Sequence, residues 1–150
     1  MTDTVFDCNV YVQALLGRGS ANRCLKAVGS TVRLWCSDAI LVEVIDVLSR
    51  AAVRRKNPDL TDTVALDYIA EIRRVAIVEI VVPKLFSLPS DPDDEMYLNL
   101  AIAAKAVFVV TRDKHLLRLM TANDLNSQLF RAAFPEIEVL TPEPFLARLP

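Results

Sequence analysis

The sequence predicts an α/β protein whose parallel sheet is covered by helices on both faces. Short apolar runs alternate with longer segments in which apolar residues recur every three or four positions, so strands and helices alternate along the chain. The runs are apolar on both faces, as expected of parallel strands that are buried from two sides. No internal repeat, low-complexity tract or linker-like segment divides the 150 residues. We therefore expect one doubly wound domain over residues 1–150.

The expected strands are short and are bounded by turn residues or acids. They cover residues 5–6, 32–36, 77–82, 107–111 and 137–140. The expected helices begin after capping residues such as Ser37 and Thr61, and they end near glycine, asparagine or the next strand. They cover residues 9–16, 21–28, 38–56, 61–75, 92–106, 114–120 and 123–133, and residues 142–149 complete the chain.

Composition and charge exclude several classes of protein. Hydrophobic residues make up 53% of the chain, yet no apolar run approaches the roughly 20 residues that span a membrane. The net charge of -2 gives no global basic signal, so a nucleic-acid partner must be held by local basic patches. The N-terminal residues show no signal pattern, and the three cysteines lack metal or disulfide spacing. We expect a cytoplasmic protein with buried free thiols and no membrane segment.

Acidic residues stand where a parallel sheet places its ligand site. Asp7 and Asp113 each follow an apolar strand, and the run from Ser90 to Glu95 carries four carboxylates at an expected helix start. Glu43 lies among aliphatic residues of the helix after the second strand. Ligands of open parallel sheets bind beyond the carboxyl ends of the strands, where the strand order reverses. If the first and fourth strands are neighbours, these acids converge on one crevice.

Such a cluster of carboxylates requires a positive partner. Like charges in a partly buried site repel and force protons onto some of the groups. Because the candidate ligands are oxygens, without histidine or thiolate, the cluster favours Mg²⁺ or Mn²⁺ over zinc. One or two such ions could orient water for phosphodiester hydrolysis.

Each acid also has a purely structural interpretation. Asp91, followed by Pro92, is typical of a helix N-cap, and acids in the first helical turn interact favourably with the helix dipole. Asp7 and Asp113 are also common turn residues, and Glu43 fits the polar border of a helix. A cap alone does not require four acids, so we favour the shared site.

The ordered set of these motifs resembles the PIN domain, the nuclease fold of VapC-like toxins. The matching segments are Val5-Phe6-Asp7-Cys8-Asn9, Leu41-Val42-Glu43, Asp91-Pro92-Asp93-Asp94-Glu95 and Thr111-Arg112-Asp113. The closing segment from Leu140 to Leu146 is also similar, so the resemblance covers essentially the whole chain.

The resemblance implies a three-layer α/β/α sandwich with a five-stranded sheet in the order 3-2-1-4-5. It also implies a Mg²⁺- or Mn²⁺-dependent endoribonuclease that cleaves single-stranded RNA, the toxin of a type II toxin-antitoxin pair. The carried-over metal ligands and catalytic acids are Asp7, Glu43, Asp94 and Asp113. The auxiliary residues are Asn9, Asp91 and Glu95, and which carboxylate of the acidic run points inward stays open.

The chain departs from the family pattern at two positions. Cys8 stands where threonine is usual, and Arg112 stands where glycine is common, so Arg112 either shields the pocket or binds a phosphate. Local cations are the other candidates for RNA contacts. The candidate RNA-binding residues are Arg54, Arg55, Lys56, Arg112 and Lys114, although basic residues at a helix C-terminus are also favoured by the helix dipole.

Two other functions and two partners remain to be weighed. A haloacid dehalogenase-type phosphatase also has an Asp after its first strand, but it needs a second Asp where this chain has Asn9. A PIN-like module that binds RNA or protein without catalysis is the second alternative. Apolar residues near Leu15, Leu16, Tyr68 and Phe86 suggest partner surfaces, for which we expect a homodimer and an antitoxin helix.

Overall fold

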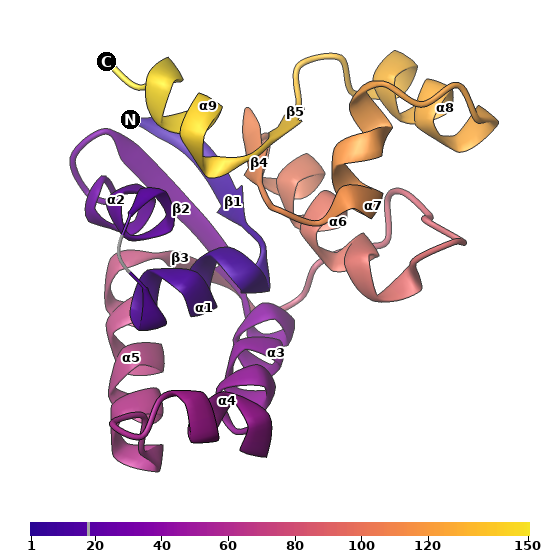
Figure 1. The fold of residues 1–150 in the computed structure, drawn as a ribbon. Coiled ribbons are helices and arrows are strands. Elements are labelled where there is room, and N and C mark those ends of the chain that lie inside the picture. The colour runs from indigo at the N-terminus through magenta and orange to yellow at the C-terminus, as the bar shows by residue number, and fades with distance from the viewer. Residues whose placement is uncertain (18) are drawn as a thin grey trace.

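The computed structural model describes residues 1–17 and 19–150 and contains a five-stranded parallel sheet (Figure 1). The strand order is β3-β2-β1-β4-β5, which confirms the predicted order. The strands are β1 (Thr2–Phe6), β2 (Val32–Ser37), β3 (Ile77–Glu79), β4 (Phe108–Val110) and β5 (Glu138–Leu140). The first strand lies between β2 and β4, so the strand order reverses beside β1, as the prediction of a shared site requires.

Helices cover the sheet on both faces, as expected for the α/β/α class (Figure 1). The α-helices are α1 (Cys8–Leu16), α2 (Ser20–Lys26), α3 (Asp38–Leu48), α4 (Ala51–Lys56), α5 (Asp62–Val75), α6 (Glu95–Ala104), α7 (Lys114–Leu117), α8 (Leu125–Ala133) and α9 (Pro142–Arg148). Two short 3₁₀ helices are η1 (Pro92–Asp94) and η2 (Arg118–Met120). Helix α6 packs against β1, β2 and β4, while α9 packs against α2 and β4. No helix among the described residues is long and apolar enough to cross a membrane.

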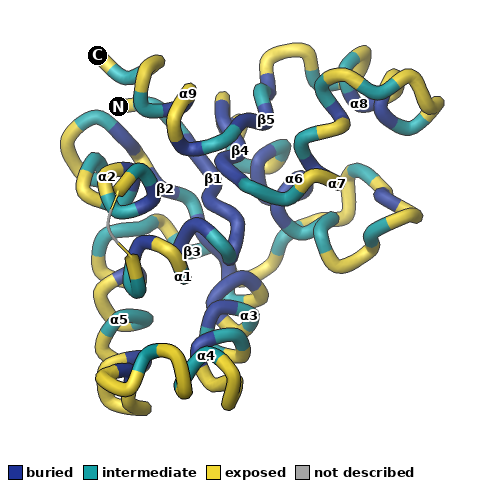
Figure 2. Tube along the Cα trace, viewed as in Figure 1, coloured by how far each residue is buried: buried dark blue, intermediate teal, exposed yellow. Residues whose placement is uncertain are grey.

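The core is centred on β1 and β4, which are buried from both sides (Figure 2). Val5, Phe6, Val109 and Val110 are fully buried. The Phe6 ring meets the rings of Tyr11 and Phe145 edge-on, with centroids 5.8 and 6.0 Å apart, which joins β1 to α1 and α9. The two strands that carry acids at their carboxyl ends therefore lie at the centre of the core.

The third strand is shorter than predicted. The β-branched run over residues 77–82 predicted six strand residues, but only Ile77–Glu79 pair with β2. The pairing stops because β2 ends at Ser37, opposite Glu79, and the chain turns there into α3. Ile80 and Val81 continue past the sheet and are 80% and 81% exposed. The length of a strand is set here by its partner and not by its own propensity.

The predicted helix over residues 38–56 is interrupted. Helix α3 ends at Leu48, α4 begins at Ala51, and Arg50 between them has an extended backbone. The Leu48 carbonyl accepts a 2.7 Å hydrogen bond from Arg54 Nε in place of a bond from the next helical turn. The side chain of Arg54 thus satisfies a carbonyl that the break leaves without an intrahelical donor.

The acidic run also starts differently from the prediction. Pro92–Asp94 form the 3₁₀ turn η1, and the α-helix begins at Glu95. The Asp91 carbonyl accepts a 3.0 Å bond from the Asp94 amide, but the Asp91 side chain makes no capping bond, so the predicted side-chain cap is wrong. The carboxylates of this run are consequently free for other contacts.

Candidate functional site

Asp7 lies at the carboxyl end of β1, beside the end of β4. Its backbone amide donates a 2.9 Å hydrogen bond to the Val110 carbonyl, which extends the pairing of the two strands by one residue. The side chain caps no helix amide, although Asp7 directly precedes α1. The residue is 4% exposed, and its Oδ2 accepts hydrogen bonds from Thr111 Oγ1 at 2.5 Å and Asn9 Nδ2 at 3.3 Å. Asp7 is thus a buried carboxylate held in one orientation.

Thr111 connects Asp7 with Asp113. It is fully buried directly after β4, and its hydroxyl donates to Asp7 while accepting a 2.9 Å bond from the Asp113 amide. Asp113 then caps α7, since its Oδ1 accepts a 2.8 Å bond from the His115 amide. Asp113, for which the structural alternative was a turn residue, is thus a helix cap that also lies beside the other acids.

Asp94 completes a cluster of three aspartates, Asp7, Asp94 and Asp113, here called the acidic cluster. Burial, the largest cause, and the negative charges of Asp113, Asp7 and Asp91 together raise the pKa of Asp94 to about 7. The Asp113 carboxyl group lies within hydrogen-bonding reach of Asp94. Burial also raises the pKa of Asp7, and Asp113 contributes to this shift. Strands β1 and β4 and the start of α6 thus bring the three carboxyl groups into mutual electrostatic contact.

Tyr97 links Glu43 to this cluster. It lies one helical turn after Asp94, is fully buried, and donates a 2.7 Å hydrogen bond from its hydroxyl to Glu43 Oε2. The same hydroxyl accepts a 3.2 Å bond from the Cys8 amide and lies beside Asp7. Burial, together with the charges of Asp7 and Glu43, raises the pKa of Tyr97 far above its ordinary value. The hydroxyl therefore stays protonated and holds Glu43 on the rim of the site.

The other acids of the run have separate partners. Glu95 Oε1 accepts a 2.8 Å bond from the Leu88 amide, and its Oε2 lies 3.6 Å from Lys84 Nζ, so this carboxylate holds the preceding loop. Asp91 Oδ2 contacts His115 Nδ1. Asp93 is exposed. Of the four carboxylates in the run, Asp94 is the one whose charge interacts with Asp7 and Asp113.

Two of the candidate RNA-binding residues have their side chains bound within the protein. Arg112 makes hydrogen bonds to Gln13, Ser20 and Glu143, none of which belongs to the acidic cluster. Arg54 bonds to Leu48 and lies 2.8 Å from Asp62 Oδ1. In contrast, Arg55, Lys56 and Lys114 are exposed and make no ion pair with any described residue.

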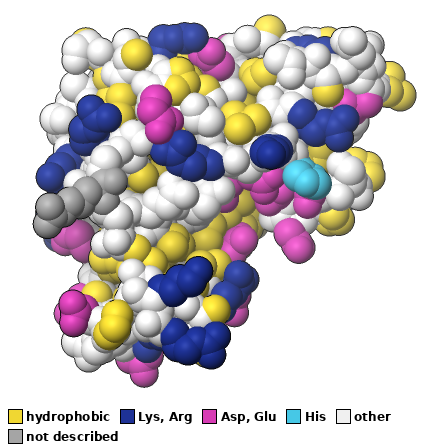
Figure 3. Space-filling view, in the orientation of Figure 1, with side chains coloured by type: hydrophobic (Ala, Val, Ile, Leu, Met, Phe, Trp, Pro, Cys, Tyr) yellow, Lys and Arg dark blue, Asp and Glu magenta, His cyan; other side chains and the backbone are white. Residues whose placement is uncertain are grey.

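The surface around the acids is of mixed charge (Figure 3). Acidic side chains gather beside the histidine in the middle of this face, and Lys and Arg side chains gather below, over α4. The basic side chains in the last turn of α4 are Arg54, Arg55 and Lys56. Such a surface suits a polynucleotide that contacts the positive groups with some of its phosphates while another phosphate lies at the negative site.

The donor chemistry of the cluster fits a hard divalent cation. Every candidate ligand is a carboxylate oxygen, and the nearby thiol of Cys8 has its pKa raised to about 12 by burial and by the charges of Glu43 and Asp7, so it stays protonated. In the side-chain positions of the described part of the chain, no group of three or more acidic, histidine or cysteine side chains is arranged to hold a metal ion. The residues therefore fit Mg²⁺ or Mn²⁺ by the type of donor atom, and the carboxylates would have to reorient to coordinate an ion.

Sequence reasoning missed two residues that hold the site together. From the sequence, Thr111 is interpreted as the last residue of an apolar strand. In the structure its buried hydroxyl bridges Asp7 and Asp113, and the signal for this role is that a buried hydroxyl needs a hydrogen-bond partner. Tyr97 reads as part of the apolar face of a helix, and its only sequence signal is its position three residues after Asp94.

Comparison with known proteins agrees with this geometry. A protein-family model described as PIN domain matches residues 3–115, a range that contains Asp7, Glu43, Asp94 and Asp113. No curated protein matches the chain. The family match leaves the phosphatase alternative without support, and PIN domains in general are metal-dependent nucleases. The chain belongs to the PIN domain family.

Proposed function

We propose that this chain is an endoribonuclease that cleaves single-stranded RNA with Mg²⁺ or Mn²⁺, and that it acts in the cytoplasm as the toxin of a type II toxin-antitoxin pair. The observation that carries the proposal is the convergence of Asp7, Asp94 and Asp113, with Thr111 bonded to both Asp7 and the Asp113 amide. Burial, reinforced by repulsion from the neighbouring carboxylates, raises the pKa of Asp94 to about 7. A divalent cation between these carboxylates would relieve the repulsion and favour the ionised form of Asp94.

Each residue of the site would have a distinct role in binding the cation or in orienting the groups around it. Asp7, Asp94 and Asp113 would hold the cation, which when bound supplies charge stabilisation and lowers the pKa of a coordinated water. Thr111 and Asn9 keep the Asp7 carboxylate in place through hydrogen bonds of 2.5 and 3.3 Å. Tyr97 fixes Glu43 at the edge of the same site. Glu43 is suited to orient water or a leaving group there, because its carboxylate is only half-buried.

The RNA substrate would be held by cations outside the acidic cluster. Arg55, Lys56 and Lys114 are exposed, and Lys114 directly follows Asp113. Each can neutralise a phosphate without breaking an ion pair recorded for the described residues. Arg54 and Arg112 have intramolecular partners, so the support for an RNA contact is concentrated on the three exposed residues.

A cleavage assay tests the proposal. Purified protein is incubated with a labelled single-stranded RNA and Mn²⁺, with single-stranded DNA and duplex RNA in parallel. We expect metal-dependent cleavage of the single-stranded RNA, and its loss in Asp7→Asn and Asp94→Asn. Asp59→Asn is the matched control because Asp59 is an exposed aspartate outside the acidic cluster. Full activity in Asp7→Asn and Asp94→Asn would reject the proposed site, and binding without cleavage by the wild type would favour a non-catalytic module.

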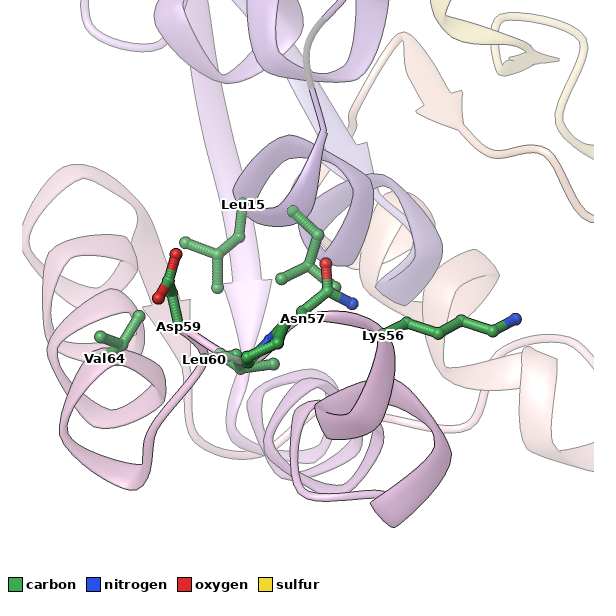
Figure 4. Close-up of a pocket in the computed structure, with 8 residues that line it drawn as sticks. Leu15, Lys56, Asn57, Asp59, Leu60 and Val64 are labelled. Atoms are coloured by element: carbon green, nitrogen blue, oxygen red, sulfur yellow. The ribbon is translucent and has the colours of Figure 1, made fainter.

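The proposed antitoxin contact has one concrete location. Leu15 and Leu16 at the end of α1 line a pocket of about 400 Å³, together with Leu60, Val64 and the loop before α5 (Figure 4). Tyr68 and Phe86 are less suitable for a partner, since the Tyr68 hydroxyl bonds to the Tyr11 carbonyl at 2.6 Å and the Phe86 ring packs on Phe130. We propose that an apolar residue of the antitoxin helix enters the pocket at Leu15 and Leu16.

The homodimer is a separate part of the proposal. Its support is the set of exposed apolar side chains, among them Ile80, Val81 and Leu125, which are 80%, 81% and 72% exposed. Light scattering on the isolated protein tests it. A monomer at micromolar concentration would contradict the homodimer without affecting the nuclease assignment.

A further inference from the structure

Arg112 occupies the middle of the segment that carries two residues of the site. Its neighbours Thr111 and Asp113 bind Asp7 and face Asp94, respectively. The guanidinium group makes four hydrogen bonds to three different elements, and none of its partners belongs to the acidic cluster. Nε donates to Gln13 Oε1 at 2.8 Å on α1, and one terminal nitrogen donates to Ser20 Oγ at 2.8 Å on α2.

The strongest of these contacts is a bidentate pair with Glu143 on α9. The two terminal nitrogens of Arg112 lie 3.2 and 2.7 Å from the two carboxylate oxygens. Ser20 Oγ also donates a 2.9 Å bond to Glu143. The hydrogen bond from Arg112 lowers the pKa of Glu143 to about 2, so this carboxylate is ionised over the whole pH range in which the protein would be studied. The carboxylate therefore keeps the charge that the pair requires.

The backbone of Arg112 contacts the site directly. Its amide donates a 3.4 Å hydrogen bond to Asn9 Oδ1, and Asn9 Nδ2 in turn donates to Asp7 Oδ2. A displacement of the Arg112 backbone would thus move Asn9 and Asp7, and it would also shift Thr111 and Asp113 on either side. The side-chain bonds to α1, α2 and α9 resist such a displacement.

We propose that Arg112 is a positioning residue and that, with Glu143, it couples α9 to the geometry of the acidic cluster. This inference rests on the proposed function. Helix α9 lies outside residues 3–115, which the PIN domain model matches. The proposed coupling therefore links the acidic cluster to a helix beyond the matched range. To bind RNA, Arg112 would have to exchange a carboxylate that already makes a bidentate contact for a phosphate, so the proposal assigns it to positioning.

The test uses the full chain and a matched ion pair on the same helix. The test variants are Glu143→Gln, Arg112→Gln, Arg112→Lys and the double variant. The control is Glu138→Gln, which breaks another bidentate pair of α9, since Arg148 lies 2.6 and 2.8 Å from the carboxylate oxygens of Glu138 on β5. Each variant is measured for Mn²⁺ affinity by calorimetry, for kcat and KM on single-stranded RNA, and for melting temperature.

A positioning role predicts that Mn²⁺ affinity and kcat fall together, by about tenfold, in Glu143→Gln and Arg112→Gln, as is typical when a residue that orients a ligand is removed. KM for RNA should not change, and the Glu138→Gln control should keep both values. Arg112→Lys should recover only part of the loss, because an ammonium group cannot make the bidentate contact. The double variant should lose little more than either single variant, since both remove one coupling.

Other results overturn the inference in distinguishable ways. A raised KM with unchanged Mn²⁺ affinity would assign Arg112 to RNA binding. A lowered melting temperature alone, equal to that of the control, would reduce the pair to ordinary stabilisation. If the wild type binds Mn²⁺ but cleaves no RNA, the proposed function fails while the affinity series still decides the coupling. A wild type that binds no Mn²⁺ overturns both.

Discussion

Replacing Asp94 by asparagine should stabilise the metal-free protein at pH 8. The pKa of Asp94 is about 7, against an ordinary value of 3.8, so ionising this group in the folded state is unfavourable. The full difference corresponds to about 4 kcal/mol by proton linkage. Asp94 is only half-buried, and solvent screening reduces the expected gain to about 1–2 kcal/mol. For a chain of this size that gain corresponds to an increase in melting temperature of roughly 2–8 °C.

The pH dependence gives the sign of the effect. A carboxyl group whose folded pKa is raised contributes stability that is fully present below pH 3.8 and is lost as the pH rises through about 7. Wild type should therefore lose stability relative to Asp94→Asn between pH 4 and pH 7, and the difference should level off above pH 7. Burial also raises the pKa of Asp7. The stability of Asp94→Asn should therefore still fall as the pH rises, but by less than the stability of the wild type.

Urea denaturation in EDTA, followed by circular dichroism, measures this difference at pH 5 and pH 8. Asp93→Asn is the matched control, since Asp93 is the exposed neighbour of Asp94 in η1. Added Mn²⁺ should then stabilise the wild type more than Asp94→Asn, because only the wild type keeps the full set of ligands. If Asp94→Asn is no more stable than the wild type and the control at pH 8 in EDTA, the carboxylates do not repel one another as described, and the argument for a cation site fails.

Three further predictions concern residues around the cluster. Tyr97→Phe should lower the free energy of unfolding by about 1–3 kcal/mol, because Glu43 and the Cys8 amide lose their hydrogen-bond partner. It should also lower kcat with little change in KM, and unchanged kinetics would show that Tyr97 does not act in the site. Thr111→Val removes a hydrogen bond that lowers the pKa of Asp7, so the acidic limb of the cleavage pH profile should move to higher pH, whereas a superimposable profile would contradict the bridge. Cys8, Cys24 and Cys36 are buried and the pKa values of all three thiols are raised, so a thiol reagent at pH 8 should label them only after unfolding; rapid labelling of the native protein would show that the site region opens.

The sequence allowed the fold and the principal acids to be predicted because both depend on local patterns. Asp7 and Asp113 follow apolar strands, and parallel topology alone then places them at one edge of the sheet. The end of β3 and the break at Arg50 were not predictable in this way, since each depends on where a neighbouring element stops. The same reason explains Thr111 and Tyr97, whose roles exist only once three distant segments meet.

Arg112 illustrates a different limit of sequence reasoning. A basic residue beside a predicted nuclease site is reasonably interpreted as a phosphate ligand, and its type and position are correct for that role. In the folded chain the guanidinium bonds to Glu143, a residue 31 positions later, and this contact is the basis for proposing a positioning role instead. The sequence can indicate that a charged residue lies near a site, but the folded structure is needed to identify the residue with which it pairs.

The location of the acidic cluster also bears on the kind of substrate. Small-molecule sites are usually concave and mostly apolar. The pocket of about 400 Å³ at Leu15 and Leu16 is concave, with a lining that mixes apolar residues with Lys56, Asn57 and Asp59, yet it includes none of the three clustered aspartates. The acids instead lie on a face shared with basic side chains over α4 (Figure 3). A chain of phosphates can engage such an open, charged face at several points, whereas a small ligand would gain little burial there. The open, charged setting of the aspartates therefore favours a polymeric nucleic acid over a small ligand at this site.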